Sequence, residues 1–205
     1  MGMEPFNPLE KRSLAESVVQ ALLKRPCHPL PPSDPFVGAG IYALYYSGPF
    51  PPYEPIAQKN SGGRCEQPIY VGKAVPQGAR KGRFGLDACL GDVLFRRLKE
   101  HAQSIEQGEN LELADFSCRY LIVDEIWIPL AEQFLIEVFS PIWNVVIDGF
   151  GNHDPGAGRY NQKKSAWDVL HPGRPWATKL QPSDSTREEL VERIARALRV
   201  DTSSP

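Results

Sequence analysis

Two short apolar stretches, each containing a tyrosine, place the strongest constraint on how this chain folds. They are residues 40–46 (GIYALYY) and 68–73 (PIYVGK). Each is rich in β-branched and aromatic residues and is bounded by Gly or Pro, so each predicts a strand. If the two strands pair, the phenols of Tyr42 and Tyr70 lie side by side on one face of a small sheet. Two tyrosines carry no charge at neutral pH, so a charged site at this place requires side chains from later in the chain.

The rest of the chain alternates helical and strand patterns. Apolar spacing predicts helices over residues 9–24, 92–107, 129–140 (with Leu130, Phe134, Leu135 and Val138 as the apolar stripe) and 186–200, and β-forming residues predict a strand over 116–127. Residues 26–35 and 47–67 are proline-rich and predict a linker and a long loop, and residues 74–91 predict a glycine-rich basic insertion. The order predicts an α+β fold with a small antiparallel sheet flanked by helices.

This order also predicts the domain organisation. We expect an N-terminal helix and arm over residues 1–35, a core over 36–148 with two inserted loops, and a loop-rich extension with a helix over 149–205. At 205 residues, the three parts are expected to form a single compact domain.

Composition excludes several classes of protein. No apolar run approaches the ~20 residues that a membrane helix needs, and residues 1–5 do not resemble a secretory signal. The four cysteines lie far apart, without metal-finger spacing, so we expect reduced thiols in a cytoplasmic protein. The net charge of −2 gives no general argument for nucleic acid binding. The stretch from Lys73 to Lys99, however, contains seven Lys and Arg residues and only two Asp residues. Such a patch suits phosphate, or is simply a solvated surface.

Four polar residues follow the tyrosine strands in order. Arg97 and His101 are four apart, therefore on one helical face, where Arg97 suits phosphate oxygens and His101 can move a proton. Glu132 lies off the apolar stripe of the next helix, and Asn144 follows Pro141. Each has a simpler interpretation, as a surface ion pair, an exposed histidine, a solvated acid or a turn residue. Together with Tyr42 and Tyr70 they have the chemistry of phosphodiester hydrolysis.

The blocks Gly40-Ile41-Tyr42, Ile69-Tyr70-Val71-Gly72, Arg97 with His101, Glu132 followed by Leu135-Ile136, and Pro141 with Asn144 resemble the GIY-YIG nuclease family over residues 40–146. The resemblance implies a three-stranded antiparallel sheet and a catalytic set of Tyr42, Tyr70, Arg97, His101, Glu132 and Asn144. It also implies one Mg²⁺ per active site, held by Glu132, with Mn²⁺ able to substitute. The spacings of 28 residues from Tyr42 to Tyr70 and 25 from Gly72 to Arg97 exceed those of a compact family core.

Residues 148–156 and 172–177 are similar to the type II restriction endonuclease branch of the family, which includes a homodimeric enzyme that cuts CCGCGG. This resemblance implies a cytoplasmic homodimer that cleaves double-stranded DNA at a short palindromic GC-rich site, with CCGCGG as the candidate. A homing or repair nuclease of the same family and a non-cleaving DNA-binding module remain alternatives. So does the choice between Tyr42 and His101 as general base.

The DNA contacts are assigned from basic and amide side chains. We expect Lys73, Arg80, Lys81 and Arg83 to contact the backbone and Asn152, His153, Arg159 and Arg174 to read bases, with Lys163 and Lys164 as further contacts.

Overall fold

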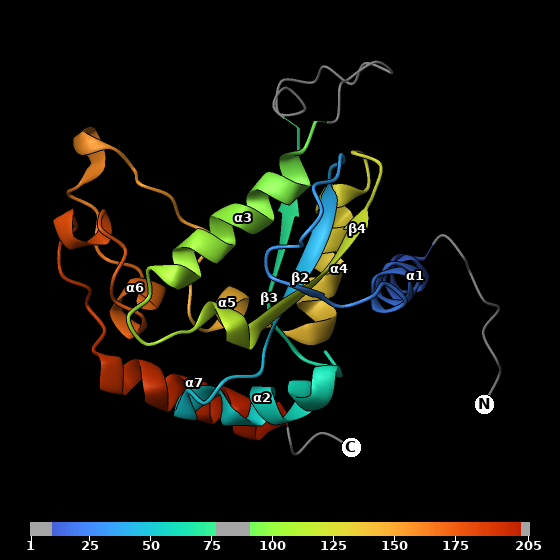
Figure 1. Cartoon of the computed structure of the whole chain (residues 1–205). Helices are drawn as coiled ribbons and strands as arrows, with labels where there is room; N and C mark the ends of the chain where they lie inside the picture. Colours follow the sequence, from blue (N-terminus) through green and yellow to red (C-terminus); the bar gives the residue numbers. More distant parts are fainter. Residues whose placement is uncertain (1–9, 77–90, 202–205) are drawn as a thin grey trace.

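A four-stranded antiparallel sheet, in the order β1-β4-β2-β3, organises the structure, a computed structural model that describes residues 10–76 and 91–201 (Figure 1). The strands are β1 (His28–Pro29), β2 (Gly40–Tyr46), β3 (Pro68–Ala74) and β4 (Phe116–Ile122). The helices are α1 (Lys11–Leu23), α2 (Glu54–Asn60), α3 (Val93–Glu106), α4 (Ile128–Phe139), α5 (Ile142–Val145), α6 (Ala166–Leu170) and α7 (Arg187–Asp201). The α+β class and the antiparallel sheet flanked by helices are confirmed.

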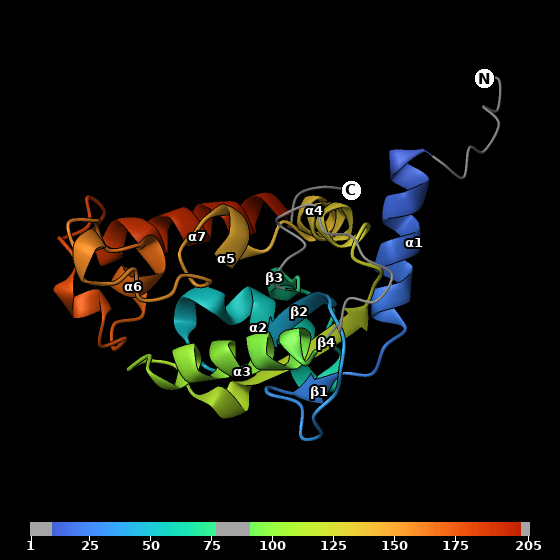
Figure 2. The ribbon, with the colours of Figure 1, turned by 90° about the horizontal axis from the view of Figure 1, so that it is seen from above.

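Strand β2 is the centre of the fold, and every one of its residues is buried. Its alternate side chains Ile41, Ala43 and Tyr45 belong to a core cluster shared with α1 and α4. The intervening Tyr42, Leu44 and Tyr46 belong to a second cluster with α3 and the C-terminal segment. Figures 1 and 2 show α3 and α4 on opposite faces of the sheet. An apolar run without polar alternation is what a strand covered on both faces requires.

The glycines of the two motif strands are needed because other atoms occupy the space of a side chain. A Cβ on Gly40 would lie 2.0 Å from the Leu121 carbonyl oxygen of β4. A Cβ on Gly72 would lie 2.3 Å from the Tyr42 hydroxyl, because Tyr42 is the register partner of Gly72. Gly72 therefore leaves room for the Tyr42 ring to cross β3.

Two segments expected to be irregular contribute regular structure. Residues 26–35 were predicted to be a linker, but His28–Pro29 pairs with Ser117–Cys118 and adds a fourth strand to the expected three. Residues 47–67 were predicted to be a long loop, but they contain α2, which buries Ile56 and Ala57. Burial of apolar side chains stabilises α2 despite its proline-rich surroundings, whereas β1 is defined by its pairing with β4.

The extension after residue 148 packs on the core. Trp167 in α6 and Leu190 and Ile194 in α7 share one hydrophobic cluster with Trp143 and with α3. In Figure 1, α7 runs along the bottom of the molecule below α6, and the two helices contact each other. On α4, Ile128, Ala131, Phe134 and Leu135 are buried. Val138, predicted on that stripe, is exposed, and Phe139 packs against the core cluster in the last turn instead.

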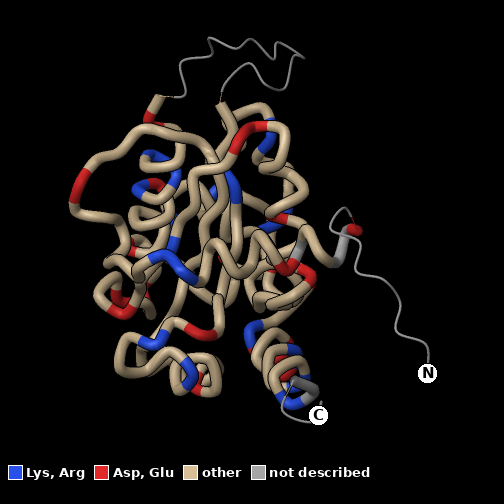
Figure 3. Tube along the Cα trace, turned by 90° about the vertical axis from the view of Figure 1, so that its right-hand side faces the viewer, with Lys and Arg blue, Asp and Glu red and all other residues tan. Residues whose placement is uncertain are grey.

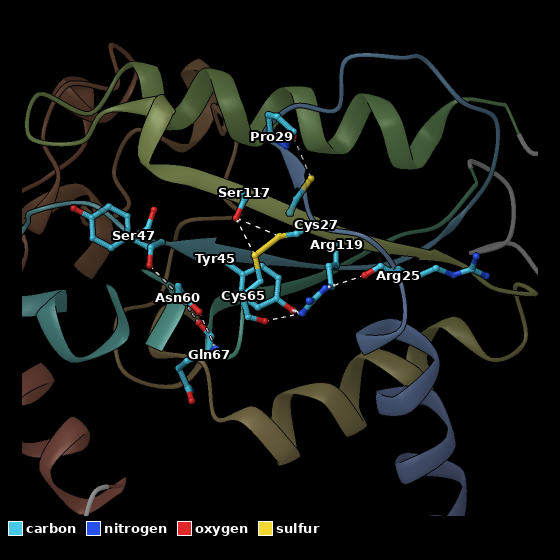
Figure 4. The surroundings of a disulfide bond; sticks show 12 residues. Arg25, Cys27, Pro29, Tyr45, Ser47, Asn60, Cys65, Gln67, Ser117 and Arg119 are labelled. Carbon is cyan, nitrogen blue, oxygen red and sulfur yellow. Dashed lines mark hydrogen bonds between the residues drawn. A yellow bond between two sulfur atoms is a disulfide. The ribbon is translucent and has the colours of Figure 1, made fainter. Parts of the chain in front are cut away.

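The expectation of reduced cysteines is wrong for two of the four. Cys27 and Cys65 form a disulfide, which ties the segment before β1 to the segment before β3 (Figure 4). Ser117 Oγ lies 3.4 Å from both sulfur atoms, and Arg119 donates to the Arg25 and Cys65 carbonyls. The pairing crosses 38 residues of sequence and depends on the sheet that places the two segments together. Cys118 is a buried free thiol.

In the part of the chain that the structure describes, no helix is both long enough and apolar enough to cross a membrane.

Candidate active site

The two motif tyrosines lie on one face of the sheet, as the strand pattern predicted. Tyr42 pairs with Gly72 and Leu44 pairs with Tyr70, so the two phenols are diagonal neighbours on adjacent strands. Their ring centroids are 6.2 Å apart. Tyr42 is fully buried beneath the site, whereas Tyr70 is partly exposed. Both line a cavity of about 460 Å³.

Helix α3 crosses this face and presents His101 to Tyr42. The Tyr42 hydroxyl and His101 Nε2 are 2.5 Å apart. Burial raises the pKa of Tyr42 well above its ordinary value, and the adjacent Tyr70 adds to the rise. Burial lowers the pKa of His101 well below its ordinary value, and the charge of Arg97 lowers it further. At neutral pH this pair is therefore a neutral phenol hydrogen-bonded to a neutral imidazole.

Arg97 lies one turn before His101 and reaches the same cavity. Its Nη2 donates to the Gly151 carbonyl at 3.0 Å, and its Nη1 donates to Glu100 at 3.0 Å and contacts His153. Burial raises the pKa of Tyr70, and the Arg97 guanidinium opposes that rise. Arg97 is thus the permanent positive charge beside both phenols.

Glu132 and Lys73 also line the cavity and form an ion pair there. Lys73 Nζ lies 2.7 Å from Glu132 Oε2, and the Glu132 side chain is 20% exposed. Lys73 follows Gly72 on β3, and Glu132 lies on the face of α4 that borders β3. Glu100 also lines the cavity, but its carboxylate is paired with Arg97.

Asn144 lies on the outer edge of β3. Its Oδ1 accepts from Val71 N and its Nδ2 donates to Val71 O, each at 2.8 Å. The amide therefore replaces a neighbouring strand at the residue after Tyr70, and both backbone groups of Val71 are satisfied. Asn144 acts on the geometry of β3 and is not among the residues that line the cavity.

A segment that sequence reasoning used only for DNA contacts closes the site, and we call residues 149–153 the site loop. Phe150 stacks on His101 with ring centroids 4.5 Å apart and packs edge-on against Tyr70 at 4.9 Å. Gly151 and His153 line the cavity. Phe150 was not among the predicted site residues. A single aromatic residue between two glycines was the signal that could have indicated it.

The predicted DNA contacts are spread over several places. His153 and Lys73 line the active-site cavity, whereas Asn152, Lys163 and Lys164 line a second cavity of about 550 Å³. Lys163 forms an ion pair with Asp184, and Arg159 is exposed in a short turn. Arg80, Lys81 and Arg83 lie outside the described residues. Figure 3 shows Lys and Arg intermixed with Asp and Glu along the described trace.

Arg174 does not lie where a base-reading residue must. Its side chain is 0% exposed, and it pairs with Asp168 at 2.7 Å. The guanidinium also contacts the faces of Trp167 and Trp176. The expectation that Arg174 reads bases is therefore corrected, because a group that contacts neither solvent nor the surface cannot reach a base edge in this structure.

Comparison with known proteins places these residues in a family. A search of curated proteins finds no match to the chain. A family model described as the Eco29kI GIY-YIG domain matches residues 34–198, which include strands β2, β3 and β4, the residues that line the cavity and most of the C-terminal extension. Since this match covers more than half of the 205 residues, the chain belongs to the Eco29kI GIY-YIG domain family, a GIY-YIG family of type II restriction endonucleases.

Proposed function

We propose that this nuclease is a type II restriction endonuclease that hydrolyses double-stranded DNA at a short palindromic GC-rich site, with CCGCGG as the candidate sequence. The observation that carries the proposal is the buried Tyr42–His101 hydrogen bond at the base of a cavity that Arg97 and Glu132 also line. This cavity combines a route for a proton, a fixed cation and a carboxylate, which phosphodiester hydrolysis requires.

The proton of the attacking water leaves through Tyr42 and His101. A buried neutral phenol is a weak base, so it needs an acceptor for its own proton. His101 Nε2 lies 2.5 Å away, and its lowered pKa keeps the imidazole neutral and able to accept. As Tyr42 takes a proton from water, it passes its hydroxyl proton to His101, so that no isolated phenolate forms.

Arg97 and Tyr70 hold the phosphate. The Arg97 fork is suited to two non-bridging oxygens, and its side chain is only partly exposed on the cavity wall. Tyr70 stands beside it with its ring held by Phe150 and His101. Asn144 fixes the strand from which Tyr70 projects, through its two hydrogen bonds to Val71.

The residues of the cavity fit a divalent cation at Glu132. Its carboxylate is partly exposed and already faces a cation, the Lys73 ammonium at 2.7 Å. Within residues 10–76 and 91–201 there is no group of three His, Cys, Asp or Glu side chains placed to hold a metal ion. One carboxylate suits Mg²⁺, which keeps several waters and binds substrate phosphate, and Mn²⁺ prefers similar ligands. When bound, this ion supplies charge stabilisation at the phosphate and the leaving oxygen.

A homodimer follows from the proposed palindrome. One cavity per chain cuts one strand, so a two-fold axis shared by protein and DNA places one subunit on each half-site.

The direct test is digestion of supercoiled plasmids, with and without CCGCGG, by the purified protein and Mg²⁺. Discrete fragments whose sequenced ends map to one palindrome support the proposal, and EDTA should abolish them. Glu132→Gln should lose cleavage, whereas Glu137→Gln, on the exposed side of the same helix, should retain it. Cleavage without sequence preference would indicate a repair-type nuclease, and binding without cleavage would indicate a non-cleaving module.

A further inference from the structure

Arg174 holds the site loop by its backbone. Its Nη2 donates to the Gly149 carbonyl at 3.0 Å, and its Nη1 donates to the Phe150 and Asn152 carbonyls at 3.1 and 3.3 Å. Its Nε donates to Asp168 Oδ1 at 2.7 Å. Three carbonyls of a five-residue loop thus converge on one guanidinium, and the planar fork fixes their relative positions.

The surroundings hold the guanidinium itself in place. Its carbon lies 4.4 Å from the ring centroid of Trp167 and 4.6 Å from that of Trp176. Asp168, also buried, supplies the opposite charge, and Ser165 Oγ donates to its other oxygen at 2.7 Å. These partners hold the guanidinium in one position, because a shift that broke any of these contacts would leave a buried polar or charged group with neither a partner nor solvent.

The segment before Arg174 is tied to the end of α3. The Glu109 amide donates to the Pro172 carbonyl at 2.8 Å, and Asn110 Nδ2 donates to the Leu170 carbonyl at 3.0 Å. Asn110 Oδ1 also lies 2.8 Å from His171 Nδ1. Arg174 is therefore anchored to the helix that presents Arg97 and His101.

We propose that Arg174 is a positioning residue for catalysis, which sets the site loop against Arg97 and His101. The loop contacts both through Phe150, which stacks on His101, and through the Gly151 carbonyl, which accepts from Arg97 Nη2 at 3.0 Å. Arg174 thus joins the end of α3 to a loop that returns to the middle of α3. The expected effect of Arg174 on cleavage rests on the proposed nuclease function. Its effect on the position of the site loop rests on the loop contacts alone.

The test compares Arg174→Lys with a control, Leu198→Ala, which shortens a buried α7 side chain in the hydrophobic cluster that contains Trp167. Lysine keeps the charge, but its three donors are on one nitrogen, so it cannot make the four hydrogen bonds that Arg174 makes to Asp168 and the three carbonyls. We expect kcat to fall by about 100-fold in Arg174→Lys, since a small misplacement of catalytic groups has effects of that size, with KM for DNA little changed. Hydrogen exchange of the amides of residues 149–153 should rise locally, including Asn152 N, which donates to Gly149 O.

Three results would overturn the inference: a wild-type kcat in Arg174→Lys, a rise in KM with kcat unchanged, or an equal loss of kcat in Leu198→Ala. If Arg174→Lys does not fold, Trp176→Ala removes the half-buried ring on one side of the guanidinium. It should still raise loop exchange and lower kcat, and an unchanged loop would contradict the inference. Hydrogen exchange is measured on the protein without DNA, so it tests the loop whether or not the protein cuts DNA. Failure of the proposed function would be seen separately, as a wild-type protein that does not cut DNA.

Discussion

The Tyr42 hydroxyl lies 2.5 Å from His101 Nε2, and neither side chain is more than 1% exposed. The same core contains a second buried pair, Tyr53 and His171, at 2.7 Å. That pair is occupied on both sides, since Trp143 Nε1 donates to Tyr53 and Asn110 faces His171. The two pairs differ in the residues that surround them. Tyr42 opens on the cavity beside Arg97, so only this pair has the surroundings of a proton relay.

Removing either member of the Tyr42–His101 pair should slow cleavage and leave DNA binding intact. We expect Tyr42→Phe and His101→Gln each to lower the single-turnover rate by about 10²- to 10⁴-fold, the usual contribution of general base catalysis. Tyr53→Phe is the matched control: it should lower the free energy of unfolding by about 1–3 kcal/mol, through the partners it leaves unpaired, without a comparable loss of rate. A Tyr42→Phe variant that cleaves at the wild-type rate would refute the relay.

Stability should fall as the solution is acidified below about pH 6.5, the ordinary pKa of histidine. Burial lowers the pKa of His171 to about 3 and lowers that of His101 as well. Below pH ~6.5 the unfolded chain therefore binds protons that the native protein does not, so each such histidine lowers the free energy of unfolding by about 1.4 kcal/mol per pH unit. Urea unfolding at several pH values measures the slope. His171→Gln should reduce it, and an unchanged slope would contradict the assignment.

The site was predictable because its spacing is local. Arg97 and His101 share a helical face through a separation of four residues, and the order of the motif blocks indicates which strand and helix follow. Arg174 could not be placed in this way. An arginine between Gly and Pro is usually exposed, and the hydrogen bonds that hold this one reach carbonyls 22 to 25 residues earlier in the chain. The aromatic residues Trp167 and Trp176 on either side of it were the only local indication.

The sheet was predictable to the extent that its strands carry β-forming residues. β2, β3 and β4 have them, whereas β1 is two residues long and includes a proline, so only its partner β4 defines it as a strand. The helix α2 has Pro55 in its first turn, where the missing N–H has no cost, and a count of prolines therefore hides it. The Cys27–Cys65 pairing likewise requires knowledge of the sheet.

Asn144→Asp should loosen the outer edge of β3. Aspartate loses the amide donor and places an oxygen against the Val71 carbonyl, which Asn144 Nδ2 now contacts at 2.8 Å. We expect a loss of about 1–3 kcal/mol in the free energy of unfolding, and a slower cleavage rate because Tyr70 precedes Val71. Asn161→Asp, at an exposed position, makes the same chemical change as a control. Equal stability of the two variants in urea would show that the Val71 contacts contribute little.

Reduction of the disulfide should destabilise the fold without changing the chemistry of the cavity. Cys27 and Cys65 close a loop of 38 residues, for which disulfides typically contribute about 2–4 kcal/mol. Urea unfolding with and without a dithiol reductant measures this difference. The double variant Cys27→Ser/Cys65→Ser should be insensitive to the reductant, and a reductant effect of equal size in that variant would contradict the pairing.

The site loop approaches the catalytic side chains so closely that one methyl group should interfere. A Cβ on Gly151 would lie 2.9 Å from the Tyr70 hydroxyl and 3.3 Å from Arg97 Nη2. Gly151→Ala should therefore displace the loop or the phenol, and we expect kcat to fall by about 10- to 100-fold, as for other small misplacements. Gly158→Ala is a suitable control, because its added Cβ meets no atom within 4 Å. Both variants add the same methyl group to the extension. A loss of rate confined to Gly151→Ala would therefore locate the effect at the contact with Tyr70 and Arg97. Equal rates in the two variants would show that the loop can move aside.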